Sequence, residues 1–544
     1  MKKVIVLVLA LVMILSLCAC GSKTETPKTD TPKTDTSKTD TPKTDTPDAP
    51  LEYITLRLGV VGASVGDLKI GGYPMELYTA CDLIYDFVFR SDPVTKQWTS
   101  DTLEDFHYDN DGTEMVMTLK KGIMFSNGEE AKAEDLLYSF LCRADDGNSH
   151  WIADMGFNVE ESYVRDEYTA VLKLNNKTEQ LFNRNTPLIN AKWAKETNFE
   201  PEKWYFPVGS GPYYVAEHTP DEKIVVRLKD EYWKRPVEDY YVNEYIFTRY
   251  GDSATAYMAL EVGDIDICSV TTQNYDKILN DGAAQGLGAA VVRSGCNTYI
   301  ALPGHTFAPF KDERVRRAIA IGVDWDELGV LVSGSLFIRA HGITPSDSPY
   351  YMDVGVYEYD PDKAIELLAE AGYGPGDLKP RFTTSEGNKN LGEGLTYYLS
   401  KIGIDLDVTY TDSVTATKVS ASVDGMDINV CANYGGSPSR NPALSIVAVD
   451  GSSTPTAWVD DDHLQELLAE LKNNFEQPVS VRKPLSDELQ QYIFDHVWLI
   501  PYRENAEAIG FNTNIISKET IEYAADVSYQ WLRTDRLGLR SNWE

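Results

Sequence analysis

The residues that could carry out chemistry in this chain are numerous but scattered. Seven histidines occur among 544 residues with no spacing typical of metal ligands, and H-E-x-x-H, P-loop and G-x-G-x-x-G motifs are absent from the sequence. Acidic pairs such as Asp264 and Asp266 are frequent, and two carboxylates are enough for a glycoside hydrolase. In so acidic a chain such pairs are more often solvated surface groups. The sequence therefore predicts no enzyme, no cofactor and no metal site, and a secreted hydrolase stays as a distant alternative.

The charge balance excludes one class of partner. The chain has 50 lysines and arginines against 84 acidic residues, a formal net charge of −34. Binding to nucleic acid requires a basic surface that neutralises phosphates. We therefore expect no nucleic-acid partner.

The first residues resemble the export signal of a bacterial lipoprotein. Two lysines follow Met1, an unbroken apolar run covers 4–15, and Leu17-Cys18-Ala19-Cys20-Gly21 resembles a lipobox. The resemblance implies a signal peptide over 1–19 and a lipid on the Cys20 thiol, which would anchor the protein to the outer face of a bacterial membrane, at a Gram-positive cell surface. An ordinary secretory peptide with two incidental cysteines is the alternative.

A low-complexity segment follows the lipobox. Residues 26–45 are four pentads, TPKTD, TPKTD, TSKTD and TPKTD, with no large apolar side chain. Such a segment cannot build a core, and its prolines favour an extended chain. Residues 20–50 are therefore predicted to be a lipid-anchored linker, with a glycosylated stalk as a second interpretation.

The remaining five cysteines do not form a metal-binding pattern. Their spacings are wide and their number is odd, so we expect buried, unreactive thiols. A disulfide between Cys268 and Cys296 is the alternative.

Strand and helix patterns alternate along the rest of the chain. Period-two alternation predicts strands over 53–58, 114–119, 223–229 and 404–410 and a strand beginning at 265, and apolar patterns predict helices over 81–89 and 133–141. Capping residues mark further helices, with Asp252 before 253–262, Asp312 before 313 and Asp360-Pro361 before 362–371. This mixture predicts an α/β (mixed α+β) protein with more than one lobe.

Eight stretches, in order, resemble the motifs of family 5 extracellular solute-binding proteins, the oligopeptide- and dipeptide-binding components of ABC transporters. They are DNDGT (109–113), LKKGIMFSNG (119–128), AEDLLYSF (133–140), GSGPY (209–213), DEYW (230–233), ALEVGDID (259–266), PFKDERVRRAI (309–319) and YDPDKA with LLAEAG (359–372). Most of these residues are interpreted as structural. Gly209 and Gly211 are expected to serve turn geometry, and Arg314 and Arg316 to pair with nearby acids.

The resemblance implies a two-lobed periplasmic-binding-protein-like fold (type II, cluster C) with an extra subdomain. The base of lobe I is expected to comprise 51–81, 205–300 and 505–544, with 82–204 inserted as the subdomain and 301–504 forming lobe II. A ligand would be buried between the lobes as they close. The implied protein is a monomer that captures peptides and delivers them to a permease.

The resemblance also implies where a ligand would bind. Peptide-binding relatives hold the peptide ammonium with an Asp after a strand, and Asn433 occupies that position in Val430-Cys-Ala-Asn-Tyr-Gly-Gly436. A carboxamide cannot neutralise an ammonium, so either another acid does so or the ligand is an oligosaccharide or another small solute. The other candidate contacts are spread along the chain: Tyr434, Gly435, Arg440, Trp458, Tyr85 and Ser64.

Overall fold

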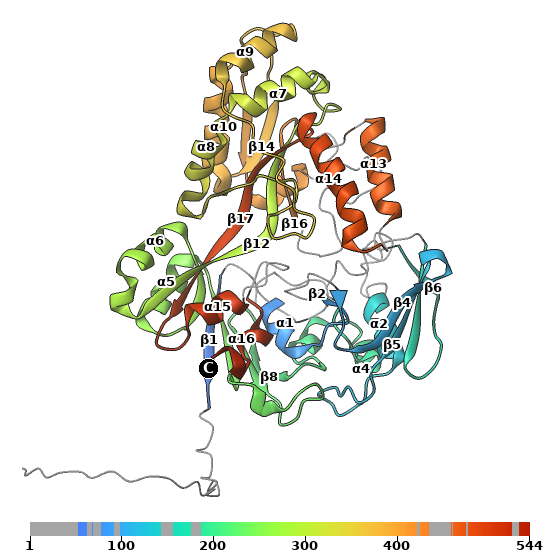
Figure 1. The fold of residues 1–544 in the computed structure, drawn as a ribbon. Coiled ribbons are helices and arrows are strands. Elements are labelled where there is room, and N and C mark those ends of the chain that lie inside the picture. The colour runs from blue at the N-terminus through green and yellow to red at the C-terminus, as the bar shows by residue number, and fades with distance from the viewer. Residues whose placement is uncertain are drawn as a thin grey trace, which may run out of the picture. The chain divides into compact units, whose positions relative to one another are not determined.

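The computed structural model describes residues 53–61, 68, 78–91, 98–142, 156–175, 186–420, 425–434, 459, 461–474, 477–524 and 532–543 (Figure 1). The chain divides into two units, Met1–Glu52 and Tyr53–Glu544. The predicted signal peptide, Cys20 and the linker lie outside the described residues. Everything below concerns the second unit.

A nine-stranded sheet runs through this unit in the order β16-β12-β17-β11-β1-β10-β9-β8, with β13 paired to β17. The strand β1 is parallel to β10 and to β11, and the other pairs are antiparallel. Alternate residues of β1 are buried, as its period-two pattern predicts. The bounds are β1 Thr55–Val61, β8 Tyr213–Thr219, β9 Lys223–Leu228, β10 Glu244–Tyr250, β11 Ile267–Val270, β12 Leu287–Ala301, β13 Ile338–Arg339, β16 Asn429–Tyr434 and β17 Leu499–Asn512.

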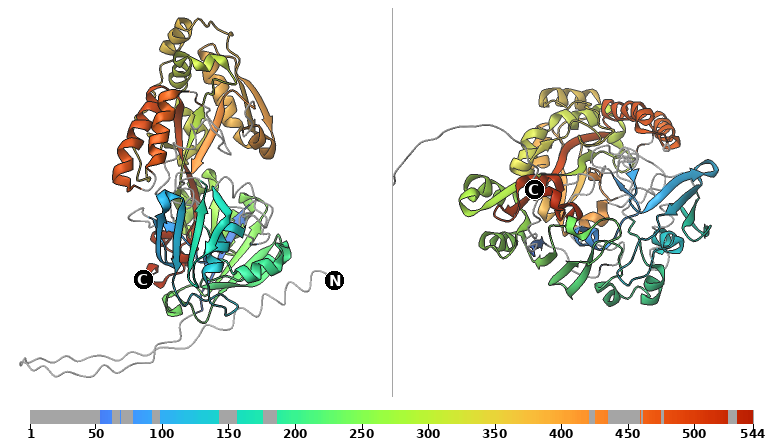
Figure 2. Two further views of the ribbon diagram at one scale, coloured as in Figure 1. Left: turned by 90° about the vertical axis from the view of Figure 1, so that its right-hand side faces the viewer. Right: turned by 60° about the horizontal axis from the view of Figure 1, so that its bottom comes forward.

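A separate four-stranded antiparallel sheet has the order β4-β5-β7-β6 and packs against one helix. Its strands, blue to cyan, face the viewer in the left panel of Figure 2. The first hairpin turns at Asn110–Gly112, where Asn110, Asp111 and Gly112 all have positive φ. The bounds are β4 Leu103–Asp109, β5 Glu114–Leu119, β6 Phe157–Val164, β7 Thr169–Leu174 and α2 Ala133–Leu141, beside the short pair β2 Arg90–Ser91 and β3 Trp98–Thr99.

Two groups of helices build the remaining cores. The first surrounds the parallel pair β14 Arg381–Ser385 and β15 Asp407–Thr411 and comprises α7 Glu313–Gly322, α8 Trp325–Ser333, α9 Pro361–Glu370, α10 Lys389–Lys401 and α11 Ser413–Ser420. The second consists of α13 Asp462–Asn473 and α14 Val479–Asp495, which pack on each other. The other helices lie near the large sheet or α2: α1 Tyr78–Ile84, α4 Ala191–Thr197, α5 Ser253–Val262, α6 Thr272–Asp281, α15 Lys518–Ala524 and α16 Thr534–Leu537.

The strands β12 and β17 connect the cores to one another. One end of each, with Val292 and Ile509, packs in the core of β1 and β8–β10, and the other end, with Ile300 and Ile500, packs with α7–α10. Their register breaks between Arg293 and Asn297, where Gly295 has a φ of 60°. Figure 1 shows the two strands running side by side between these cores. The two strands therefore pass from one core to the other where the strand pairing between them is interrupted.

Most of the elements expected from sequence are present, and one expectation was wrong. The strand 114–119 and the helices 133–141 and 253–262 are confirmed, the last with Asp252 as N-cap and Gly263 left-handed at its end. The helix expected over 81–89 ends at Ile84, because the chain then turns into an isolated bridge at Phe87 and the strand β2. All the residues from 81 to 89 are buried, so the apolar run has no single face that could distinguish helix from strand.

The structure also decides between buried thiols and a disulfide for the five remaining cysteines. Cys81, Cys142, Cys268, Cys296 and Cys431 are all buried and outside any disulfide, so the disulfide between Cys268 and Cys296 is excluded. Burial raises the pKa of the Cys268 thiol to about 12, which keeps it protonated and unreactive.

Candidate functional site

The candidate ligand contacts fall at very different places in the structure. Asn433 and Tyr434 are the last two residues of β16, and their backbone positions are described. Tyr85 is 1% exposed, and its hydroxyl donates a hydrogen bond to the carbonyl oxygen of Leu68 at 3.3 Å. Tyr85 therefore belongs to the core of the large sheet. The remaining candidates lie outside the described residues: Ser64, Gly435, Arg440 and Trp458.

The register of the sheet places Asn433 in line with two buried polar residues. Asn433 is directly opposite Asn297 on β12, and Asn297 is directly opposite Glu504 on β17. Paired Cα atoms in an antiparallel ladder are about 5 Å apart, so this line spans about 10 Å. We call Asn433, Asn297 and Glu504 the polar row. It lies beside the register break at Gly295.

The Asn297 and Glu504 side chains are held by the segment that follows β13. The Asn297 amide donates to the Gly342 carbonyl at 3.0 Å, while its own oxygen is buried and accepts no hydrogen bond from the described part of the chain. Glu504 accepts hydrogen bonds from the Ser346 backbone N–H at 3.2 Å and hydroxyl at 2.8 Å, and Arg293 lies 3.4 Å from it. The Glu504 charge is therefore already compensated.

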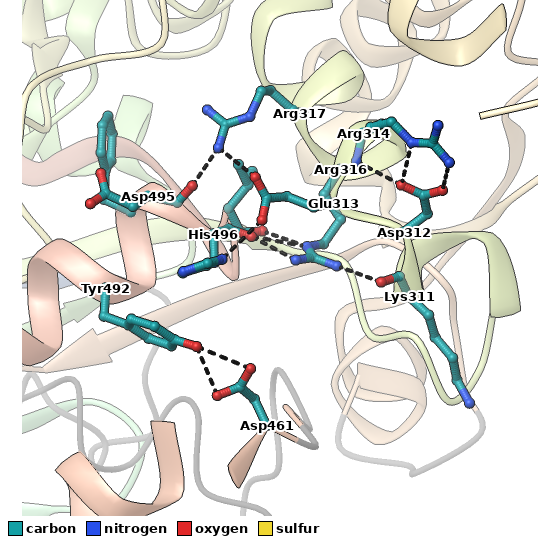
Figure 3. Close-up of polar contacts among 12 residues, drawn as sticks. Lys311, Asp312, Glu313, Arg314, Arg316, Arg317, Asp461, Tyr492, Asp495 and His496 are labelled. Carbon is teal, nitrogen blue, oxygen red and sulfur yellow. Dashed lines mark hydrogen bonds and ion pairs between the residues drawn. The ribbon is translucent and has the colours of Figure 1, made fainter. Parts of the chain in front are cut away.

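A second network fixes the start of α13, just after the candidate Trp458 (Figure 3). The Tyr492 hydroxyl on α14 donates to both carboxylate oxygens of Asp461, at 3.0 and 3.2 Å. The His496 ring lies 4.3 Å from the Tyr492 ring, and its Nδ1 is 2.9 Å from Glu313 on α7. Burial acts to raise the pKa of Glu313, but hydrogen bonds from Arg317 and His496 outweigh it and lower that pKa. The network links α7, α14 and Asp461.

Arg316 anchors the same helices in a different way from the one expected. Its guanidinium is 2% exposed and donates to the backbone carbonyls of Phe310, Lys311, His496 and Val497 at 2.7–3.2 Å, and it stacks on the Trp498 ring at 3.7 Å. Burial lowers the pKa of Arg316 to about 10. The expected pairing with local acids is confirmed for Arg314, which binds Asp312, and is wrong for Arg316.

The matches to known proteins are consistent with this geometry. Residues 97–453, more than half of the chain, match the model of bacterial extracellular solute-binding proteins, family 5. The chain belongs to this family. Its activity is therefore the binding of a solute rather than catalysis, as expected from the sequence.

Family 5 relatives differ in what they bind. The chain is 25% identical over 393 residues to oligopeptide-binding protein AppA of Bacillus subtilis, covering 63% of this chain and 68% of AppA. It is 25% identical over 342 residues to heme-binding protein A of Haemophilus influenzae, covering 56% of this chain and 61% of that relative. The structure of B. subtilis AppA in complex with a nonapeptide matches 89% of this chain and 100% of AppA, with a TM-score of 0.65 at 18% identity. This likeness shows the two-lobed, mixed α/β fold of periplasmic binding proteins.

The family 5 motifs GSGPY and DEYW meet at the C-terminal end of α1. A Cβ at Gly209 would overlap the carbonyl oxygen of Ile84, and one at Gly211 would lie 2.6 Å from the Leu83 carbonyl oxygen. Neither glycine has a positive φ, so close approach, and not the expected turn geometry, requires them.

Asp86 is the polar centre of this contact. It accepts hydrogen bonds from the Tyr232 hydroxyl at 2.6 Å and the Trp233 indole N–H at 2.7 Å, and its own N–H donates to Ser210 at 3.1 Å. Burial raises the pKa of Asp86 despite these hydrogen bonds. We call Asp86, Gly209–Gly211, Lys229, Tyr232 and Trp233 the motif cluster.

Sequence reasoning missed Asn297 and Glu504. Both lie among other polar residues in the middle of their strands, so neither stands out in the sequence, and their alignment depends on pairing between segments about 200 residues apart. Among the described residues, no group of three or more His, Cys, Asp and Glu side chains could hold a metal ion. The described helices include none that is long and apolar enough to cross a membrane.

Proposed function

We propose that this protein is the substrate-binding lipoprotein of an ABC importer, which captures peptides between two closing lobes and delivers them to a permease. The single observation that carries the proposal is the break at Gly295 in the β12–β17 ladder, next to the polar row. A protein that closes on a ligand needs a few residues that absorb the change in backbone angles, placed where the chain crosses between cores. The family membership and the AppA nonapeptide complex support the same role.

The lobe boundaries are proposed from the sequence. We propose that 51–81, 205–300 and 505–544 form the base of lobe I, that 82–204 are inserted as the subdomain, and that 301–504 form lobe II. Both crossings between the base and lobe II, near 301 and near 505, then fall on the long strands β12 and β17. Bending at this point would move lobe II as one body.

The edge position of β16 supports a peptide as the ligand. In the described sheet β16 is an edge strand, paired only with β12, so its outer backbone N–H and C=O groups face no partner strand. An extended peptide can add to such an edge through main-chain hydrogen bonds, which explains how peptides of many sequences can be bound. Asn433, Tyr434, Gly435, Arg440, Trp458 and Ser64 remain the proposed ligand contacts, whereas Tyr85 packs in the core of the large sheet.

The neutral side chain of Asn433 favours an oligosaccharide as the alternative ligand. Glu504 is two strands away and already compensated by Ser346 and Arg293, so an ammonium at Asn433 would lack a free carboxylate among the described residues of the polar row. A carboxamide suits hydroxyl groups, and therefore an oligosaccharide in the same site is the second candidate. A secreted hydrolase is not proposed.

The proposed location at the membrane rests on the resemblance of the N-terminal segment to a lipoprotein signal. We propose that lipid on Cys20 anchors a monomer to the outer face of the membrane, with residues 20–50 as the tether. Closure of the lobes would then create the surface recognised by the permease.

A thermal-shift screen of the purified protein tests the proposal. Di- to hexapeptides, the same peptides N-acetylated, and cello- and xylo-oligosaccharides are compared. A ligand at 100 times its Kd stabilises the native state by about 2.7 kcal/mol, a shift that is easily measured. The peptide proposal expects a shift with peptides and none with sugars, whereas a shift with sugars alone would replace it by the alternative. Sensitivity to acetylation then shows whether the ammonium is recognised.

A further inference from the structure

A cavity of about 300 Å³ lies in the part of the chain that contains α1 and α16. Its described lining residues come from positions 82–101, 212–240 and 523–539, and none of the described residues of 301–504 lines it. The described walls of the cavity therefore include no residue of the proposed lobe II, and they do not require closure to form.

The cavity concentrates positive charge in a protein with a net charge of −34. Five cationic residues line it, against three carboxylates. The cationic residues are Arg90, Lys234, Arg235, Arg533 and Arg536, and the acids are Asp82, Asp86 and Asp101. A local excess of cations in an acidic protein favours an anion at this place over the rest of the surface.

The carboxylates do not cancel this excess. Asp82 is shared by two cations, since Arg90 lies 2.9 Å and Arg533 3.6 Å from its oxygens. Asp101 is paired with Lys234. Asp86 is directed into the motif cluster, where Tyr232 and Trp233 donate to it. All three acids therefore already form ion pairs or hydrogen bonds with side chains of the protein.

Arg235 is a lining cation that has no acidic partner within the described structure. Within the described structure its half-buried guanidinium makes no hydrogen bond or ion pair, although it lines the cavity. A guanidinium has five N–H donors in a planar fork that matches carboxylate and phosphate oxygens. Its donors are therefore available to an anion inside the cavity.

The size and the walls of the cavity indicate the kind of molecule. A volume of 300 Å³ corresponds to about ten water molecules, which suits a compact molecule rather than an oligopeptide. The aromatic lining residues would pack against its body, and they are Tyr85, Phe87, Tyr232, Tyr240 and Tyr523.

We propose that this cavity is a second ligand site, which takes a small organic anion through a carboxylate or phosphate group held by Arg235 and the neighbouring cations. The site goes beyond the proposed transport function. An anion bound here would connect the segment after α1 to the C-terminal segment around α16, and would stabilise the native state without requiring a peptide.

Calorimetric titration of the purified protein with citrate and with inorganic phosphate, at constant ionic strength set with sodium chloride, tests the site. Saturable binding of either anion is expected, and the anion that binds identifies the carboxylate or phosphate source. Arg235→Gln and Arg536→Gln should each weaken binding at least tenfold, because each removes charged donors. Arg165→Gln, at an exposed arginine in the turn between β6 and β7, is the control and should bind as the wild type does.

Two readouts separate this proposal from the transport function. All three variants should keep the peptide-induced thermal shift, so failure of the peptide screen leaves the anion result interpretable. The proposal is overturned if neither anion binds saturably, if sodium chloride alone produces the same effect, or if Arg235→Gln and Arg536→Gln both bind with wild-type affinity.

Discussion

The motif cluster and the polar row each contain buried polar side chains, but they differ in how completely the hydrogen-bonding groups of these side chains are satisfied. In the motif cluster, Asp86 receives two side-chain hydrogen bonds, and glycines allow the backbones to meet. In the polar row, the Asn297 oxygen has no donor within the described structure and the ladder is broken at Gly295. A satisfied polar region fixes the framework, whereas an incompletely satisfied one lies where movement and ligand binding are proposed. Changes in the first should therefore cost stability, and changes in the second should alter affinity.

The largest expected effect is in the motif cluster. Gly209→Ala places a methyl group against the Ile84 carbonyl oxygen and should destabilise the protein by about 3 kcal/mol or more, measured by urea unfolding. Gly251→Ala is the matched control, because a Cβ there meets nothing within 4 Å, and it should change stability by less than about 0.5 kcal/mol. Equal effects of the two substitutions would show that close packing is not the reason for Gly209.

Arg316→Met tests whether framework groups outside the motif cluster behave in the same way. The substitution leaves the buried carbonyls of Phe310, His496 and Val497 without their donor and should cost about 3 kcal/mol in unfolding free energy. Arg314→Met, at the exposed position of the same helix, should cost less than about 1 kcal/mol. A larger loss for Arg314→Met would contradict the assignment of the anchoring role to Arg316.

Lys229 should make the stability contributed by the motif cluster depend on pH. Burial lowers the pKa of Lys229 to about 8 from 10.5, although nearby Asp86 acts in the opposite direction. Between these values the unfolded chain binds a proton that the native state does not, so stability rises with pH over this window. Relative to Lys229→Met, the wild type should gain about 1–3 kcal/mol between pH 8 and 10.5 in chemical denaturation. A flat difference across this range would show that the lysine is not desolvated.

The smallest expected effect concerns the polar row, and it should appear as a change in the affinity for peptides. Asn433→Asp should strengthen binding of free-amine peptides about tenfold, because a carboxylate can neutralise the ammonium. The same peptides N-acetylated serve as the control and should bind no better than to the wild type. Unchanged affinity for both kinds of peptide would remove Asn433 from the ligand site.

The sequence predicted elements whose signals are local. Asp252 and Gly263 bound one helix by capping, and 114–119 form a strand with the expected bounds. The region 85–89 could not be predicted, because burial on all sides removes the periodicity that distinguishes helix from strand. Glu504 could not be placed either, since its position opposite Asn297 follows from long-range strand pairing. The role of Gly209 likewise depends on contact with Ile84, which is remote in sequence.

The most direct test of the central claim is a distance measurement between spin labels on the two sides of the Gly295 break. Arg165→Cys in the turn between β6 and β7 and Lys379→Cys beside β14 place labels at exposed positions, and the five described native cysteines are buried. With a saturating concentration of the peptide that gives the largest thermal shift, the account predicts a shorter distance distribution between the labels. An unchanged distribution, with binding verified by the thermal shift, would contradict closure about the β12–β17 break.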